Sequence, residues 1–198
     1  MLQELATMCH SLDFDEKRAK EIAQSINLNQ VFVLDRFPTT LLNEAGESQN
    51  VAMIKLLLEM GADPNVMFDD TCVLSCLQYA WDNEQPSNYE HLLEITQLLL
   101  EYGANPNIVV ENEIVFYSVM YGLFNDGFLC EEYWQYISRF YILLVAYGGK
   151  DDGYCVPRIV GEFDKANMEQ YEFYFVPEDN NRYSGIIKDG NGNVVAYI

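Results

Sequence analysis

Carboxylates are the residues of this chain with the greatest capacity for chemistry, because the sequence contains 31 Asp and Glu residues but only 2 histidines. Two neighbouring carboxylates can act as acid and base when their surroundings separate their pKa values. In a chain this acidic, however, adjacent carboxylates arise by chance, and His10 and His91 leave little material for a catalytic triad. We therefore assign no catalytic residue and expect a protein that is not an enzyme. The adjacent pairs include Asp69–Asp70, Glu131–Glu132, Asp151–Asp152 and Glu178–Asp179.

The cysteines indicate a reduced protein core and no metal site. Cys72 and Cys76 lie four residues apart on an expected helix, but neither a second pair nor a nearby His completes a zinc tetrahedron. No G-x-G-x-x-G or P-loop pattern is present to bind phosphate. We therefore expect core thiols, no metal and no cofactor. The five cysteines are odd in number and irregular in spacing: Cys9, Cys72, Cys76, Cys130 and Cys155.

The net charge of −20 is strongly acidic and unevenly distributed along the chain. Residues 56–138 contain no Lys or Arg but 14 Asp and Glu. Such a surface repels nucleic acid phosphates and anionic membranes, so neither is an expected partner. No apolar run approaches the roughly 20 residues that span a bilayer, and the first residues lack the features of a secretory signal. Together with the cysteines, this composition predicts a cytoplasmic protein.

A ten-residue phrase occurs twice in the chain, at residues 56–65 and 98–107, and returns in altered form at 143–150. The second copy reads Leu-Leu-Leu-Glu-Tyr-Gly-Ala-Asn-Pro-Asn. Its physical chemistry is that of a helix end: apolar residues complete a buried stripe, Gly adopts the left-handed cap conformation, and Pro prevents continuation. Upstream of the three copies, residues 40–45, 71–76 and 113–118 each read as the start of another helix.

This helix start and helix end together resemble the ankyrin repeat, and the resemblance covers residues 31–152. It implies a mainly α fold, an ankyrin-type α-solenoid of about four helix pairs with a small C-terminal antiparallel β element. The Pro and His of the family's first helix are absent, and the second and third units carry insertions around residues 81–88 and 121–128. We expect an N-terminal capping helix pair (1–30), three ankyrin-like repeats (31–152) and a C-terminal β-hairpin or meander cap (153–198).

The two ends of the chain have patterns of their own. Apolar stripes at residues 2–9 and 19–26 predict two helices, the second opened by Asp13 or Asp15 as its cap. Apolar alternation at 171–176, 183–188 and 194–198 predicts three antiparallel strands. The segment Asp-Gly-Asn-Gly-Asn at 189–193 favours a tight turn between the last two strands. It also begins like a calcium loop, but the sixth position is Val194 instead of Gly, so we expect a turn.

The resemblance also implies where a partner protein binds. Ankyrin proteins usually contact partners through the tips of their β-loops and the exposed side of their first helices, which form a concave face. On this chain those positions combine apolar and acidic residues, which suits a basic partner protein. We expect the chain to be a monomer when it is not bound to that partner. The partner-binding residues are then Val66, Met67, Phe68, Asp69, Asp70, Tyr79, Val109, Val110, Glu111, Asn112 and Tyr121.

Three functions remain open at the level of sequence. The first is a protein–protein interaction module that holds a basic partner on the acidic concave face. The second is a bacterial immunity-type antitoxin that neutralises a basic toxin, and the third is an enzyme with an unrecognised carboxylate site. The acidity can also serve solubility alone.

Overall fold

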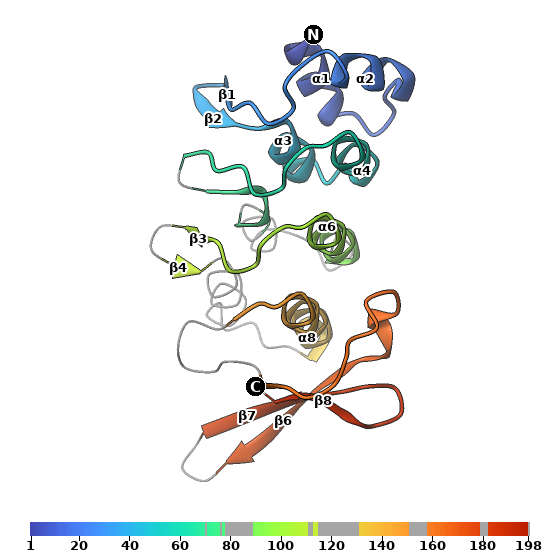
Figure 1. The fold of residues 1–198 in the computed structure, drawn as a ribbon, viewed down its shortest axis with the longest axis vertical. Coiled ribbons are helices and arrows are strands. Elements are labelled where there is room, and N and C mark those ends of the chain that lie inside the picture. The colour runs from blue at the N-terminus through green and yellow to red at the C-terminus, as the bar shows by residue number, and fades with distance from the viewer. Residues whose placement is uncertain are drawn as a thin grey trace.

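The computed structural model describes residues 1–69, 71–75, 77, 89–110, 113–114, 131–150, 158–178 and 182–197. The helices are α1 (Leu2–Cys9), α2 (Glu16–Ala23), α3 (Leu41–Glu47), α4 (Val51–Glu59), α6 (Tyr89–Glu101), α8 (Glu131–Ala146) and the 3-10 helix η2 (Met168–Gln170). The strands are β1 (Phe32–Leu34), β2 (Phe37–Thr39), β3 (Val109–Val110), β4 (Glu113–Ile114), β5 (Arg158–Ile159), β6 (Glu172–Glu178), β7 (Arg182–Lys188) and β8 (Val194–Tyr197). Helices follow one another along the long axis, and a sheet lies at the C-terminal end (Figure 1).

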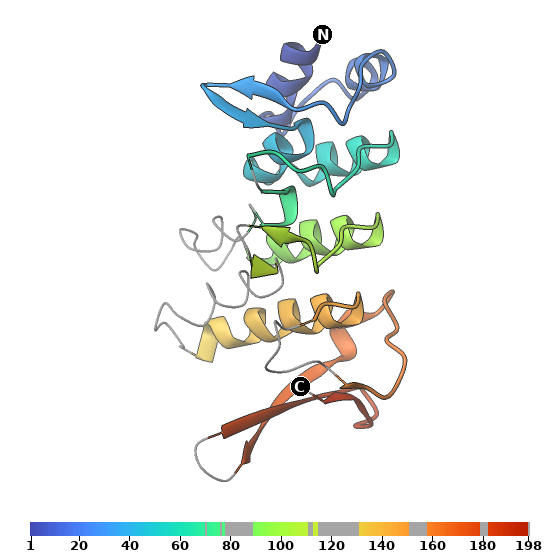
Figure 2. The ribbon, with the colours of Figure 1, turned by 60° about the vertical axis from the view of Figure 1, so that its left-hand side comes forward.

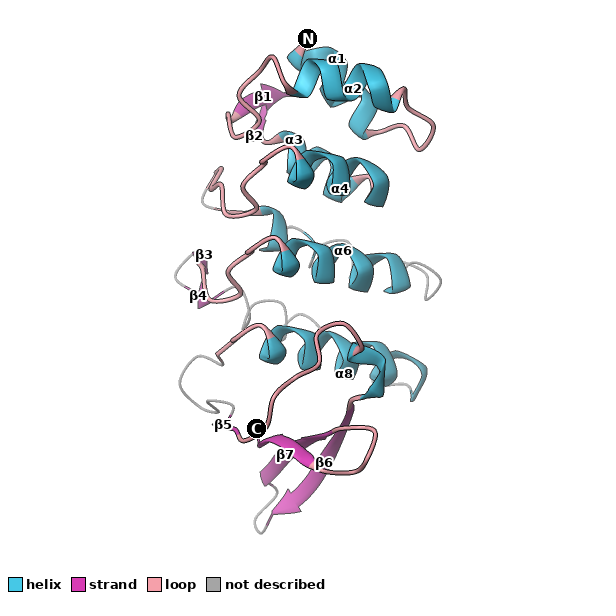
Figure 3. Ribbon diagram, turned by 45° about the vertical axis from the view of Figure 1, so that its right-hand side comes forward, coloured by secondary structure: helices cyan, strands magenta, loops and turns pink. Residues whose placement is uncertain are grey.

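The prediction of a mainly α, ankyrin-type solenoid is wrong, because antiparallel strands are a major part of the fold. The described residues form two hairpins, β1–β2 and β3–β4, and a four-stranded antiparallel sheet in the order β5-β8-β7-β6. In Figure 3 the two hairpins lie beside the helices, and the four-stranded sheet lies at the C-terminal end. One expected helix start is itself a strand, since Glu113–Ile114 pairs with β3. Loop backbone needs partners for its N–H and C=O groups, and pairing within each hairpin supplies them. The fold is therefore mixed α/β.

The N-terminal helix pair forms as its apolar stripes predict. Asp15 is the cap of α2, and its carboxylate accepts a hydrogen bond from the Arg18 amide at 2.9 Å. The Arg18 guanidinium also donates to Glu4 at 2.8 Å, which joins α2 to α1 on the exposed side. On the other side, Leu5 and Ile22 are almost completely buried. Of the two caps that the sequence left open, Asp13 and Asp15, the structure has Asp15.

The three copies of the repeated phrase adopt the same helix end. Gly61, Gly103 and Gly148 have φ angles of 95°, 91° and 84°, the left-handed conformation that the phrase predicts. The amide after each glycine closes the turn by donating to a carbonyl five residues earlier, for example from Ala104 to Leu99 at 2.9 Å. This is the hydrogen bond of a Schellman cap, so the predicted helix ends are confirmed.

The core of the molecule runs through its successive helices. The middle apolar residue of each phrase copy, Leu57, Leu99 and Leu144, is completely buried. Along the chain, α1 contacts α3, α4 contacts α6, α6 contacts α8, and α8 contacts β6. Burial of each such leucine contributes about 1.5–3 kcal/mol relative to exposure. Within the described part of the chain, no helix combines the length and the apolar character needed to cross a membrane.

The C-terminal sheet contains the predicted strands and one more. Strands β6, β7 and β8 lie close to the predicted positions, while β5 pairs with β8 and was not predicted. The turn between β7 and β8 is built by Asp189, whose carboxylate accepts the amides of Asn191 and Asn193 at 2.9 and 2.8 Å. These hydrogen bonds, with that from the Asn193 side chain foremost, lower the pKa of Asp189. The expected turn at 189–193 is therefore confirmed.

Candidate partner-binding surface

The turn at residues 66–71 contains five of the predicted partner-binding residues, and the structure describes four of them. A bridge closes this turn, since Phe68 and Thr71 exchange backbone hydrogen bonds of 2.9 and 2.8 Å. Met67 is 40% exposed and Asp69 is exposed, whereas Val66 is half-buried. Phe68 is only 6% exposed, so the prediction that it contacts a partner is not supported by its position. Its aromatic ring faces the protein instead, because a buried phenyl group is stabilised by leaving water.

The β3–β4 hairpin carries two further predicted residues. Val109 is 60% exposed, and it pairs with Ile114 while Val110 pairs with Glu113. The other predicted residues lie outside the part of the chain that the structure describes: Asp70, Tyr79, Glu111, Asn112 and Tyr121.

The β1–β2 hairpin adds apolar residues that the sequence analysis missed. Val33 is 69% exposed and Phe37 is 70% exposed, among the highest values for large apolar side chains in the described residues. The turn consists of Asp35 and Arg36, with φ angles of 48° and 81°, as in two-residue hairpin turns. The signal in the sequence was the continuous apolar run at 31–34, followed directly by the polar pair Asp35 and Arg36. It was missed because neither turn residue is Gly or Asn.

We define the hairpin edge as the exposed residues Val33, Phe37, Met67, Asp69 and Val109. The hairpins and the turn that carry them project on the same side of the molecule, away from α2, α4, α6 and α8 (Figures 1 and 2). Because they come from three successive levels of the fold, these residues form a row rather than a single cluster. The row is mainly apolar and contains one charged residue, Asp69, while Asp35 and Arg36 lie next to it in the turn between β1 and β2.

An asparagine ladder fixes the spacing between these levels. We give this name to Asn29, Asn65 and Asn107, whose side-chain oxygens each accept an amide hydrogen bond from the next level. The donors are the amides of Asp63, Asn105 and Lys150, at 2.7, 2.8 and 2.7 Å respectively. The side-chain amide groups of Asn65 and Asn107 also donate to the carbonyls of Gly103 and Gly148, at 2.9 and 2.8 Å. Each ladder residue thus pairs with backbone 34 to 43 residues further on, which holds successive turns in register.

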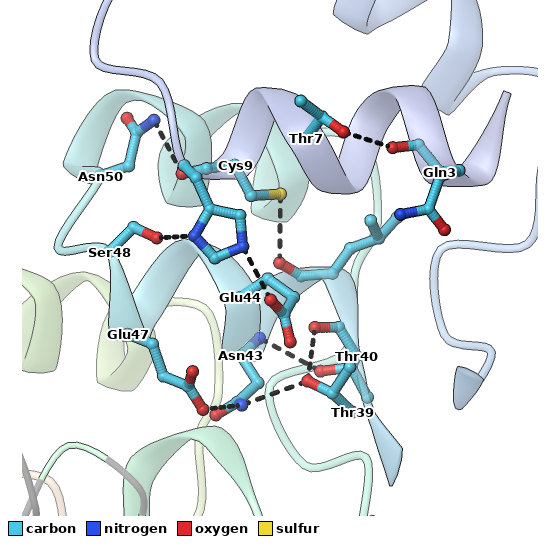
Figure 4. Close-up of polar contacts among 12 residues, drawn as sticks. Gln3, Thr7, Cys9, Thr39, Thr40, Asn43, Glu44, Glu47, Ser48 and Asn50 are labelled. Atoms are coloured by element: carbon cyan, nitrogen blue, oxygen red, sulfur yellow. Dashed lines mark hydrogen bonds and ion pairs between the residues drawn. The ribbon is translucent and has the colours of Figure 1, made fainter. Parts of the chain in front are cut away.

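A polar network anchors the base of the first hairpin (Figure 4). Thr40, directly after β2, caps α3 by accepting the Asn43 amide at 3.1 Å. Further along α3, Glu44 is 5% exposed and its carboxylate lies 2.8 Å from His10 Nε2. The other ring nitrogen of His10 lies 2.6 Å from Ser48 Oγ. The network therefore joins the end of α1 to α3, and α3 in turn begins where the hairpin ends.

The Ser48–His10–Glu44 arrangement has the residue types of a hydrolytic triad but lacks the remaining machinery. A triad needs backbone N–H groups free to stabilise an oxyanion beside the nucleophile. Here the Ser48 amide donates to Glu44 and the Gln49 amide donates to Gly46, at 3.2 and 2.9 Å. Ser48 also ends a helix, where the partial charge is negative and disfavours an oxyanion. We assign this network a positioning role.

Cys9 lies beside this network and should be chemically inert in the folded protein. Its Sγ donates to the Leu41 carbonyl at 3.5 Å, and burial, reinforced by the negative charge of Glu44, raises its pKa to about 12. At pH 8 only about one thiol in ten thousand is then ionised. We expect iodoacetamide to leave Cys9 unmodified in native protein and to alkylate it fully in urea, as measured by peptide mass spectrometry. Alkylation of the native protein at the rate of a free cysteine would contradict this burial.

The comparisons with known proteins leave the function to be argued from this surface. No protein-family model matches the chain, and no curated protein matches it. Among the described residues, no group of His, Cys, Asp and Glu is arranged to hold a metal ion.

Proposed function

We propose that this chain is a protein–protein interaction module that holds a partner protein on the hairpin edge. The observation that supports the proposal best is the row of exposed apolar side chains on three successive levels. Val33, Phe37 and Val109 are 60–70% exposed, and hairpins that served only to connect helices would not need them. Covering a large apolar side chain contributes about 1.5–3 kcal/mol, so a few such residues can anchor a partner.

The charge of the chain supports a basic partner. Asp69 lies in the row, and residues 56–138, which supply two of its three levels, contain no Lys or Arg. An acidic surface attracts a basic protein over several ångströms and accelerates its association, an effect that salt screens. Arg36 is the one base in the hairpins and turn that form the row, and it lies at the N-terminal level. A basic toxin would be one partner of this chemistry.

The resemblance to ankyrin repeats, which we retain as a proposal about the repeated phrase, supports the same surface. In that family the loops between helices contact partners. Here the three phrase copies share one cap geometry, and the asparagine ladder joins them. The hairpin edge extends from these joined turns. A ladder of this kind presents the row as a preorganised surface, which reduces the entropic cost of binding.

The test is a comparison of partners captured from the source cells by two variants. We expect Phe37→Ser with Val109→Ser to reduce the recovery of specific partners by roughly tenfold or more, since two apolar anchors are lost. Recovery is measured by quantitative mass spectrometry against wild-type protein. Leu12→Ser is the matched control, because Leu12 is 79% exposed but lies in the loop between α1 and α2.

Two outcomes would count against the proposal. One is a double variant that retains all partners of the wild type, and the other is a Leu12→Ser variant that loses the same partners. Once a partner is known, Asp69→Asn should slow association at low salt and change it little at high salt. Circular dichroism confirms that each variant is folded.

A further inference from the structure

A groove lies on the part of the molecule opposite the hairpins, between α6, α8 and the segment 166–169. It has a volume of about 410 Å³, within the range typical of ligand-binding clefts. Leu93 from α6 and Leu143 from α8 line it together with Met168 of η2, so part of its surface is apolar. In Figure 3 the helices α6 and α8 extend to the right, and the hairpins β1–β2 and β3–β4 lie at the left of the molecule.

The polar lining of the groove has unequal numbers of acids and bases. Arg139 of α8 donates to Glu90 of α6 at 2.5 Å, and the two side chains are 38% and 56% exposed. Glu94 of α6 and Glu169 of η2 also line the groove. In the described part of the chain, neither of these two carboxylates has a basic partner. The groove therefore presents one neutralised carboxylate and two that are uncompensated, on two different elements.

We propose that this groove binds an arginine side chain of a basic polypeptide segment. The guanidinium group offers a planar set of donors that can bond two carboxylates at once, and its aliphatic stem can cover apolar surface. Glu94 and Glu169 supply the carboxylates, while the half-buried Met168 supplies apolar surface for the stem over the buried Leu93. Arginine suits the site better than lysine because its charge is more weakly hydrated and is spread over a plane. This second site does not depend on the hairpin edge.

Arg139 then acts as a built-in competitor. Its guanidinium already forms an ion pair with Glu90. The three glutamates and one arginine that line the groove give it a net charge of two negative units. Removing Arg139 frees Glu90 for an incoming guanidinium and raises the negative charge of the groove. A partner cation should then bind more tightly, whereas most other substitutions at a binding site weaken binding.

The probe is a fluorescein-labelled peptide with three arginines separated by glycine and serine, titrated against the full chain at about 150 mM salt. Fluorescence anisotropy measures the dissociation constant. We expect the peptide to bind, and the same peptide with citrulline in place of arginine to bind at least roughly tenfold more weakly. Glu94→Gln with Glu169→Gln should also weaken binding roughly tenfold, and Arg139→Gln should strengthen it severalfold.

A matched control separates the groove from the general acidity of the chain. Asp13→Asn with Glu59→Gln removes the same charge from two exposed positions outside the groove. It should change the dissociation constant less than about twofold, since such distances are screened. Equal weakening by both double variants, no tightening by Arg139→Gln, or no binding of the arginine peptide would each overturn the proposal. Phe37→Ser with Val109→Ser should leave peptide binding unchanged, so failure here and failure of the hairpin edge are distinguishable.

Discussion

Replacing Asn65 and Asn107 together with alanine is expected to lower the free energy of unfolding by about 2–4 kcal/mol. Each side chain makes two hydrogen bonds to backbone of the next level, one as acceptor and one as donor. A hydrogen bond of this kind contributes about 0.5–1.5 kcal/mol net, and an amide left without its partner adds to the cost. Urea denaturation followed by circular dichroism measures the change.

The control for the asparagine ladder is Gln3→Ala, which removes an exposed side-chain amide in α1. This variant should change the free energy of unfolding by less than about 0.5 kcal/mol. Each single ladder variant should account for about half of the double effect, because the two residues tie different pairs of levels. A loss of less than about 1 kcal/mol in the double variant would mean that helix packing alone sets the register.

His10→Ala is expected to cost about 2 kcal/mol of stability, although almost half of the His10 side chain is exposed. The reason is its partner: Glu44 is 5% exposed, and without His10 its carboxylate remains in the protein with no compensating donor. Glu44→Gln should cost less than about 1 kcal/mol, because the neutral amide oxygen can still accept from the ring. Chemical denaturation at neutral pH measures both variants.

The double variant His10→Ala with Glu44→Gln tests the explanation. If the cost of losing His10 comes from a stranded charge, the double variant should be more stable than His10→Ala alone. Ser48→Ala should have a small effect in either background, since Ser48 is half-buried and water can replace its hydroxyl. Simple addition of the two single effects would instead indicate that the ring contributes through packing.

The helix ends could be predicted from sequence because every determinant is local. Each ten-residue phrase itself contains the apolar residues, the glycine and the proline that decide where α4 and α6 end. The structure has Gly61 and Gly103 in the expected left-handed conformation. The turn at 189–193 was predictable for the same reason. The β1–β2 hairpin was not, because Asp35 and Arg36 adopt positive φ angles that such residues seldom prefer. Pro38 in β2 also argues against a strand in sequence terms.

The candidate surface was predictable only in outline. Loop positions such as Met67 and Val109 were identified, but the burial of Phe68 depends on packing with residues distant in sequence. The network of His10 with Glu44 joins residues 34 positions apart, and spacing rules for a single helix or strand cannot reveal such a contact. The groove could not be predicted either, because it forms only where residues 166–169 return beside α6 and α8. Local patterns predict elements, whereas sites made from several elements require the fold.

The position of β6 at the margin of the C-terminal sheet has a consequence for aggregation. A strand at the margin of a sheet exposes unpaired backbone groups on which another chain can add a strand and begin a fibril. Pro177 lies within β6 and has no amide hydrogen to offer. Proline is tolerated within sheets mainly on edge strands, where its nitrogen faces away from the neighbouring strand. A strand added beside β6 would therefore lack one backbone hydrogen bond at Pro177, and edge prolines are one means by which natural sheets resist edge-to-edge association. We therefore expect Pro177 to disfavour edge-to-edge association between copies of this sheet.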